Sequence, residues 1–143
     1  MIEFALVLPF LLLVVLGMLD VGKAMNYRND LTHLANEAAR YAAVSRNPGP
    51  EATLEESIEQ QAASGELRSG GESITAAIDV TICYPPGSSG AIGDPIKVTA
   101  DATYRFLDFL SSGRFHLPTN VTMTGTSIMR LEKPYSLGSP PAC

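Results

Sequence analysis

The sequence has few histidines and no cluster of basic residues, and these shortages exclude several classes of function. It has 143 residues, with 10 Lys and Arg against 15 Asp and Glu, and a net charge of −5. Proteins that bind nucleic acids concentrate Lys and Arg against the phosphates, so no nucleic-acid partner is expected. The two histidines, His33 and His116, belong to no recognisable catalytic arrangement, and Glu55, Glu56 and Glu59 are better explained as a solvated helix face. We therefore expect no enzyme, no cofactor and no metal site.

Cysteine is scarce as well. Cys83 and Cys143 lie far apart and lack C-x-x-C spacing, which argues against zinc binding and against a redox motif. An even pair in an extracytoplasmic domain favours a disulfide, with free structural thiols as the alternative. We expect a Cys83–Cys143 bond that ties the C-terminal tail to the first strand.

Charge is missing from residues 4–19, an uncharged apolar run bracketed by Glu3 and Asp20 that contains Pro9. As a helix this run would extend about 24 Å, just short of a typical ~30 Å hydrocarbon core. A carboxylate this close to such a segment is costly unless it finds a partner, so Glu3 is a functional candidate. The run can hold a protein in a membrane only marginally, which suits a segment that later leaves lipid for a protein environment.

The apolar run has three interpretations. A cleaved signal peptide would have a basic start and a small-residue cleavage site, and residues 1–3 (MIE) carry no Lys or Arg. A core helix of a soluble protein would need more apolar mass elsewhere in the chain to cover all of its faces. A retained membrane anchor is the interpretation we favour, although the nearby Lys23 and Arg28 set no firm orientation.

Helical character continues beyond the anchor to residue 46. Apolar residues recur there at steps of three and four, which predicts an amphipathic stripe made of Met25, Leu31, Leu34, Ala35, Ala38 and Ala42. Asp20 is expected to pair locally with Lys23. Anchor and stripe together predict one helix of about 45 residues, roughly 65 Å long. Pro9 is expected to kink or loosen it, and residues 47–50 (NPGP) to stop it.

The rest of the chain predicts a short helix and a sheet. Residues 53–67 read as the helix, capped by Thr53 or Ala52. Residues 74–83, 96–105 and 120–131 alternate apolar and polar side chains, which predicts an antiparallel sheet covered on one face by the helical stripe. The Pro/Gly/Ser-rich segment 84–95 leads into a strand and is read as a turn-rich loop, not a phosphate-binding loop. The link 106–117 is apolar enough to be partly buried or to be a contact surface.

Three segments of the sequence resemble the TadE-like family, which comprises type IV pilin-related proteins of tight-adherence (Tad/Flp) pilus systems. The matching residues are 3–9 (EFALVLP), 36–43 (NEAARYAA) and the late strand ending at 129–132 (MRLE). The resemblance is strong over about the first 45 residues and loose over the sheet region.

The resemblance implies a small α+β, pilin-like protein that is processed by a prepilin peptidase and extracted from the inner membrane. It would be a pseudopilin, a minor pilin or the main subunit of a filament. Residues 1–22 would form the anchor and filament-core half of the helix, and residues 23–143 an extracytoplasmic domain with its helix at 23–46. Its partners would be other copies or other pilins, the membrane before assembly, and the pilus assembly machinery.

Glu3, Phe4 and Pro9 are the residues that we assign to assembly. In a dry filament core Glu3 should find a cation, most plausibly the N-terminal amine of a neighbouring subunit. The alternative is a carboxylate that lies among lipid headgroups without a partner. In pilin relatives this acid usually lies fifth after cleavage, whereas here it is third, which leaves open whether Met1 is the initiator or follows a removed leader.

A second hypothesis is a binding module. In it, a membrane-tethered sheet domain displays the 84–95 loop to a surface or partner without polymerising. The two hypotheses differ in oligomeric state, because a tethered receptor should be monomeric in detergent and a pilin should form ordered assemblies.

Overall fold

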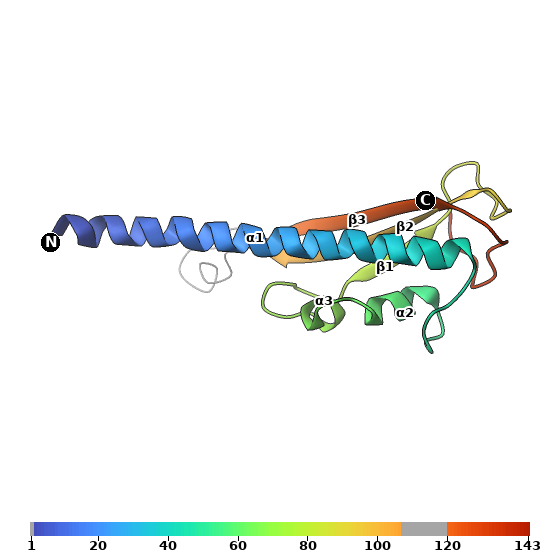
Figure 1. Cartoon of the computed structure of the whole chain (residues 1–143), viewed down its shortest axis with the longest axis horizontal. Helices are drawn as coiled ribbons and strands as arrows, with labels where there is room; N and C mark the ends of the chain where they lie inside the picture. The colour runs from blue at the N-terminus through green and yellow to red at the C-terminus, as the bar shows by residue number, and fades with distance from the viewer. Residues whose placement is uncertain (1, 107–119) are drawn as a thin grey trace.

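The computed structural model of the chain describes residues 2–106 and 120–143, leaving aside the side chains of Ile2, Glu3 and Ala5. The predicted contact surface at 106–117 therefore lies outside the described residues, except for Phe106. A long helix runs along a three-stranded antiparallel sheet, with two short helices beside it (Figure 1). The elements are α1 (Ile2–Ala43), α2 (Leu54–Gln60), α3 (Gly65–Ser69), β1 (Asp79–Cys83), β2 (Pro95–Arg105) and β3 (Asn120–Arg130). The predicted α+β, pilin-like fold is confirmed.

Helix α1 is continuous over 42 residues and passes through Pro9. At the standard rise it is about 63 Å long, and its N-terminal half projects beyond the described strands and the other helices (Figure 1). It ends at Ala43, three residues before the predicted end at 46, because Ser45 adopts a left-handed backbone with φ 52°. The freed carbonyl of Ala43 accepts hydrogen bonds from the backbone N–H groups of Glu132 and Lys133. The C-terminal tail thus caps the helix end, in the way that orphan helical carbonyls require.

The helix predicted at 53–67 is instead two helices. The side chain of Thr53 accepts a hydrogen bond from the N–H of Glu56 at 3.2 Å and caps α2, as predicted. Ser64 then caps α3 through the N–H of Leu67, also at 3.2 Å. A second capping residue inside the predicted helix starts a new helix, so the chain breaks between α2 and α3.

The sheet has the strand order β1-β2-β3, and β2 and β3 pair in register along their whole lengths. The strand predicted at 74–83 is too long, because β1 spans only Asp79–Cys83. Ile74 makes only an isolated bridge to Tyr104 before the chain leaves the sheet. Ile78 then donates its N–H to the carbonyl of Leu67, within α3, at 2.9 Å. Ala76, predicted on the apolar face, is exposed because it lies on this detour.

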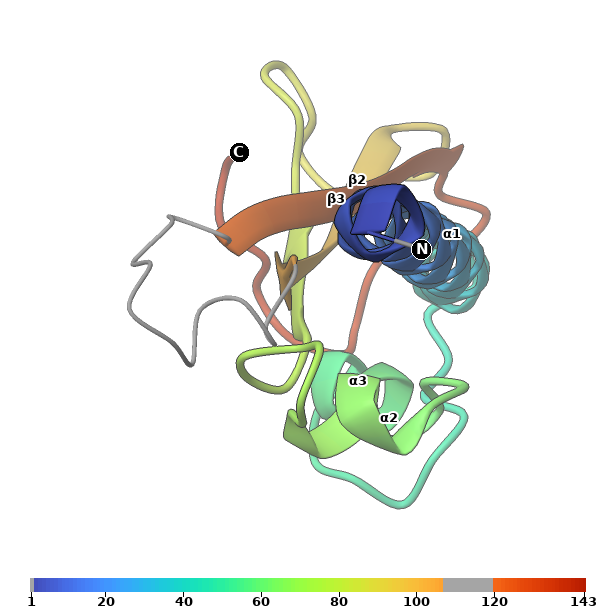
Figure 2. The ribbon, with the colours of Figure 1, turned by 90° about the vertical axis from the view of Figure 1, so that its left-hand side faces the viewer.

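The core lies between the sheet and the helices. Helix α1 contacts β2 and β3, while α2 contacts β1 and α1 (Figure 2). The predicted stripe is buried with one exception, since Met25 is 63% exposed. Gly125 lets β3 approach α1 very closely, because a Cβ at this position would lie 2.5 Å from the carbonyl carbon of Leu31. The buried α1 residues are Ala24, Tyr27, Leu31, Leu34, Ala35, Ala38, Ala39, Ala42 and Ala43.

The C-terminal tail is tied to the sheet. Cys83 at the end of β1 forms a disulfide with Cys143, with a Cα–Cα distance of 5.2 Å. The N–H of Tyr84 also donates to the carbonyl of Pro141, and the N–H of Cys143 donates to the carbonyl of Tyr84. The tail therefore closes a loop of 60 residues over the end of α1.

Candidate assembly surface

The N-terminal half of α1 exposes large apolar side chains on every face. The most exposed are Phe4 and Leu6, both at 76%, followed by Phe10 at 71% and Met18 at 70%. From Leu6 onward the helix is long and apolar enough to cross a membrane, with a mean hydropathy of 2.1 over its apolar window and none of that window buried. Isolated apolar residues on a surface are ordinary, but a contiguous patch of this size marks an interaction site or a membrane segment.

The sequence-predicted assembly residues all lie on this half of α1. Phe4 and Pro9 are exposed. Glu3 belongs to the same helix, and its side chain lies outside the described part of the structure. Pro9 is the eighth residue of α1, so it lies beyond the first turn and the helix lacks the hydrogen bond that its N–H would donate to the carbonyl of Ala5.

A polar network marks the junction between the exposed half of α1 and the domain. The hydroxyl of Tyr104, on β2, donates to the carboxylate of Asp20. Lys23 forms an ion pair with Glu66 at 3.8 Å and donates to Ser73. The predicted local pair between Asp20 and Lys23 is wrong, because a tyrosine 84 residues away reaches the carboxylate instead.

Aromatic rings pack beside this network. The rings of Tyr27 and Tyr104 lie 5.8 Å apart, and Phe106 packs edge-on against Tyr104 at 4.8 Å. Tyr27 donates its hydroxyl to Glu66 at 2.7 Å. Burial and the hydrogen bond to Asp20 raise the pKa of Tyr104 well above its ordinary value. Sequence reasoning placed Tyr104 on the apolar face of its strand but missed its partner. The signal that could have indicated a partner is that a buried tyrosine hydroxyl usually has a hydrogen-bond partner.

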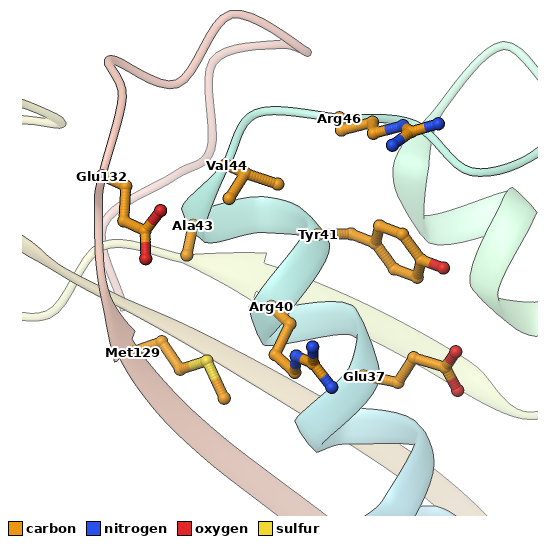
Figure 3. A pocket seen from close by; sticks show the side chains of 8 residues that line it. All are labelled: Glu37, Arg40, Tyr41, Ala43, Val44, Arg46, Met129 and Glu132. Atoms are coloured by element: carbon orange, nitrogen blue, oxygen red, sulfur yellow. The ribbon is translucent and has the colours of Figure 1, made fainter.

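A concave surface lies at the C-terminal end of α1. This groove of about 470 Å³ lies between the last turns of α1 and the end of β3 (Figure 3). Charged side chains of both signs surround Tyr41 and Met129 there, namely Glu37, Arg40, Arg46 and Glu132. No nucleophile or histidine lines it, and no group of three or more metal-ligating side chains occurs among residues 2–106 and 120–143. The groove has no arrangement that suits catalysis.

The 84–95 loop is held in a defined shape. The carboxylate of Asp94 accepts hydrogen bonds from the N–H of Ser89 at 2.7 Å and from the N–H of Ala91 at 3.2 Å. These donors stabilise the charged form, so they lower the pKa of Asp94. The loop is a turn-rich connection between β1 and β2, as its composition predicted.

Comparison with known proteins gives one family. The family model described as TadE-like protein matches residues 1–40, which are nearly the whole of α1. No curated protein and no solved structure shows significant similarity to the chain. Over residues 1–40 of its long N-terminal helix, this chain is similar to the TadE-like family, as the EFALVLP segment predicted.

Proposed function

We propose that the protein is a structural subunit of a Tad/Flp-type pilus, a TadE-like pilin or pseudopilin that assembles through packing of its N-terminal helix. The observation that carries the proposal is the match of residues 1–40 to the TadE-like family model, because the matched segment includes the half of α1 that the domain leaves uncovered. A family of pilus-related structural proteins also fits a chain without a catalytic arrangement among its described residues.

Contact with water disfavours the exposed half of α1, so this segment must be covered by lipid or by protein. Each Val, Leu, Phe or Met side chain that leaves water contributes about 1.5–3 kcal/mol. Before assembly the membrane provides this burial, and the apolar helix is what suggests membrane anchoring. In a filament, other copies or other pilins would replace the lipid. The domain would then lie outside the cytoplasmic membrane, and in an extracellular filament after assembly by the pilus machinery.

Glu3 is the residue through which the proposal is tested most directly. We assign it to pairing with the N-terminal amine of a neighbouring subunit, because an unpaired carboxylate in a dry core is strongly unfavourable. Glu3→Ala should leave membrane insertion unchanged or slightly easier and should sharply reduce ordered polymer. Glu3→Gln keeps the shape and deletes the charge, so it should show the same defect.

Membrane fractionation and filament yield would be compared for the wild type and both variants. Normal filaments from both variants would mean that Glu3 has no role and that apolar packing of residues 4–19 alone drives assembly. Loss of membrane insertion would instead assign Glu3 to the anchor.

The alternative is a tethered binding module. The loop held by Asp94 favours it, because a fixed loop at the end of a sheet is suited to display. Imaging of the purified full-length protein separates the two functions. Filaments or ordered oligomers support the pilin, and a detergent-solubilised monomer supports the binding module.

A further inference from the structure

The register of the sheet shows which backbone groups of β3 face away from β2. The carbonyl of Thr103 and the N–H of Arg105, both on β2, bond to the segment before β1, at 3.0 and 2.8 Å. Along an antiparallel strand, successive residues direct their N–H and C=O groups to alternate sides, so the even-numbered residues of β2 bond to β3. Their partners are the odd-numbered residues of β3, from Val121 to Met129. The outward-facing residues are therefore Thr122, Thr124, Thr126 and Ile128.

The opposite edge of the sheet, on β1, is closed by the protein itself. Val80 donates its N–H to a carboxylate oxygen of Glu59 on α2, at 3.2 Å. Tyr84, just beyond β1, bonds through its N–H to Pro141 and through its carbonyl to Cys143, both at 2.9 Å. The disulfide of Cys143 holds this cover in place.

The edge of β3 has no such cover. Among residues 2–106 and 120–143, no backbone group bonds to the outward side of β3. Edge strands usually carry a proline, a bulge or a charge that prevents pairing with another chain. Residues 120–129 have no proline and no charged side chain, and β3 pairs with β2 without a bulge. Two of the three large apolar side chains that are exposed outside α1 in the described residues also lie on β3, Val121 at 47% and Ile128 at 60%.

Space for a further strand lies beside β3. A groove of about 420 Å³ runs between α1 and the start of β3, along residues 121–124. The groove of Figure 3 lies at the other end of β3, beside Met129. Arg28 lines the first groove and forms no ion pair with a described residue. A segment that enters this groove should therefore carry a carboxylate on the side that faces α1.

We propose that the open edge of β3 binds an extended segment of a different protein, which adds a fourth strand to the sheet. In this mode of recognition, backbone hydrogen bonds supply the affinity and side chains supply the specificity. The bound segment has uncharged residues along residues 120–129 and an acidic residue beside Arg28. The site goes beyond the proposed pilin function, because it uses neither Glu3 nor the exposed half of α1.

A second copy of the chain is the other possible occupant. Its β1 edge is closed, which blocks head-to-tail pairing of β3 with β1. Two β3 strands paired antiparallel about a two-fold axis would make their α1 helices antiparallel as well, because α1 runs along the sheet (Figure 1). The two exposed halves would then point in opposite directions, which does not fit two copies anchored in one membrane. This argument rests on the membrane anchoring that both proposed functions share.

Amide hydrogen exchange of the full-length protein in detergent micelles tests whether the edge is open. The N–H groups of the four outward-facing residues should exchange at least about tenfold faster than those of Met123, Gly125 and Ser127, which face β2. Equal protection of the two sets would show that the edge is already covered and would overturn the proposal.

Binding is measured with a synthetic peptide of alternating threonine and valine that has a glutamate at each end. The peptide should protect the outward-facing amides, and a version with lysine at each end should bind several-fold more weakly. Thr126→Pro deletes one outward N–H and leaves the bonds to β2 in place, and the preceding Gly125 has no Cβ to clash with the proline ring. It should weaken peptide binding about tenfold. The matched control Thr126→Val keeps the N–H and should bind like the wild type.

Thr122→Pro, nearer the start of β3, is the second variant, and thermal unfolding shows that each variant is folded. Wild-type affinity of the folded proline variants, or no binding of the peptide to the wild type, would overturn the proposal. An equal loss in Thr126→Val would overturn recognition through the backbone, and equal binding of the lysine peptide would overturn the role of Arg28. Protection of the outward-facing amides that rises with protein concentration and disappears in Thr126→Pro would assign the edge to a second copy instead.

Discussion

The two halves of α1 belong to one unbroken helix and have opposite surroundings. Before Asp20 the helix exposes Phe, Leu, Val and Met in every direction, whereas after Lys23 it buries a stripe that is mostly alanine. Small side chains let the sheet approach closely, and Gly125 brings β3 almost onto the backbone of Leu31. The large side chains of the first half stay exposed, so their apolar surface can contact other molecules. The two halves of α1 therefore differ in the size of their side chains. The half with small side chains stabilises the domain, and the half with large side chains is the one that we propose for assembly.

The strongest test of this division is Leu34→Ala. Leu34 is 5% exposed beneath the sheet, so truncation should cost about 2–5 kcal/mol of the free energy of unfolding. Met18→Ala, on the exposed half, should leave that free energy unchanged. Thermal unfolding of both variants in detergent gives the comparison. If Leu34→Ala keeps the wild-type midpoint and abolishes assembly, the stripe is an interface and the division is wrong.

We expect the disulfide to contribute to the free energy of unfolding of the domain, which contains the buried half of α1, and to have no effect on the exposed half. Replacing Cys83 and Cys143 together by serine should cost about 2–4 kcal/mol, because the closed loop restricts the unfolded chain. Denaturant unfolding measures the cost, and membrane insertion should stay unchanged. Mass analysis under non-reducing conditions comes first, since two free thiols in freshly isolated protein would contradict the bond itself.

Two glycines sharpen the comparison at smaller scale. Gly125→Ala places a methyl group against the backbone of Leu31, and it should destabilise the domain by about 1–3 kcal/mol. Gly17→Ala meets nothing within 4 Å, and it should be neutral or stabilise the helix by about 0.5–1 kcal/mol. Equal effects of the two substitutions on the unfolding midpoint would show that the close approach is unimportant.

The junction should be destabilised less than the buried positions Leu34 and Gly125. Tyr104→Phe removes the hydroxyl that donates to Asp20 and should cost about 1–2 kcal/mol at neutral pH. Because burial and this hydrogen bond raise the pKa of Tyr104 above its ordinary 10.0, the folded state holds the proton more tightly than the unfolded state. Its stabilising effect is therefore complete below pH 10 and falls as the pH rises further. The difference in stability between wild type and Tyr104→Phe should shrink above this pH, and a constant difference would contradict the assignment.

Local patterns predicted much of the fold. The apolar run and the stripe predicted α1, and strict alternation predicted β2 and β3 nearly to the residue, because a strand with one buried face must alternate. The break between α2 and α3 was also a local matter, since Ser64 is a capping residue whose signal was missed. The exposure of the first half of α1 was predicted from the apolar run, because the rest of the chain has too little apolar mass to cover this helix on every face.

The sequence by itself thus determined that the domain leaves one end of the helix uncovered and that the other end packs on a sheet. Tertiary structure alone decided which long-range partners meet. Tyr104 replaces Lys23 as the partner of Asp20, because the end of β2 reaches the helix at this turn. Met25 stays exposed although it shares the spacing of the buried stripe, because the sheet covers a narrower face of α1 than the pattern allows. Such choices depend on the placement of segments distant in sequence, which local periodicity does not encode.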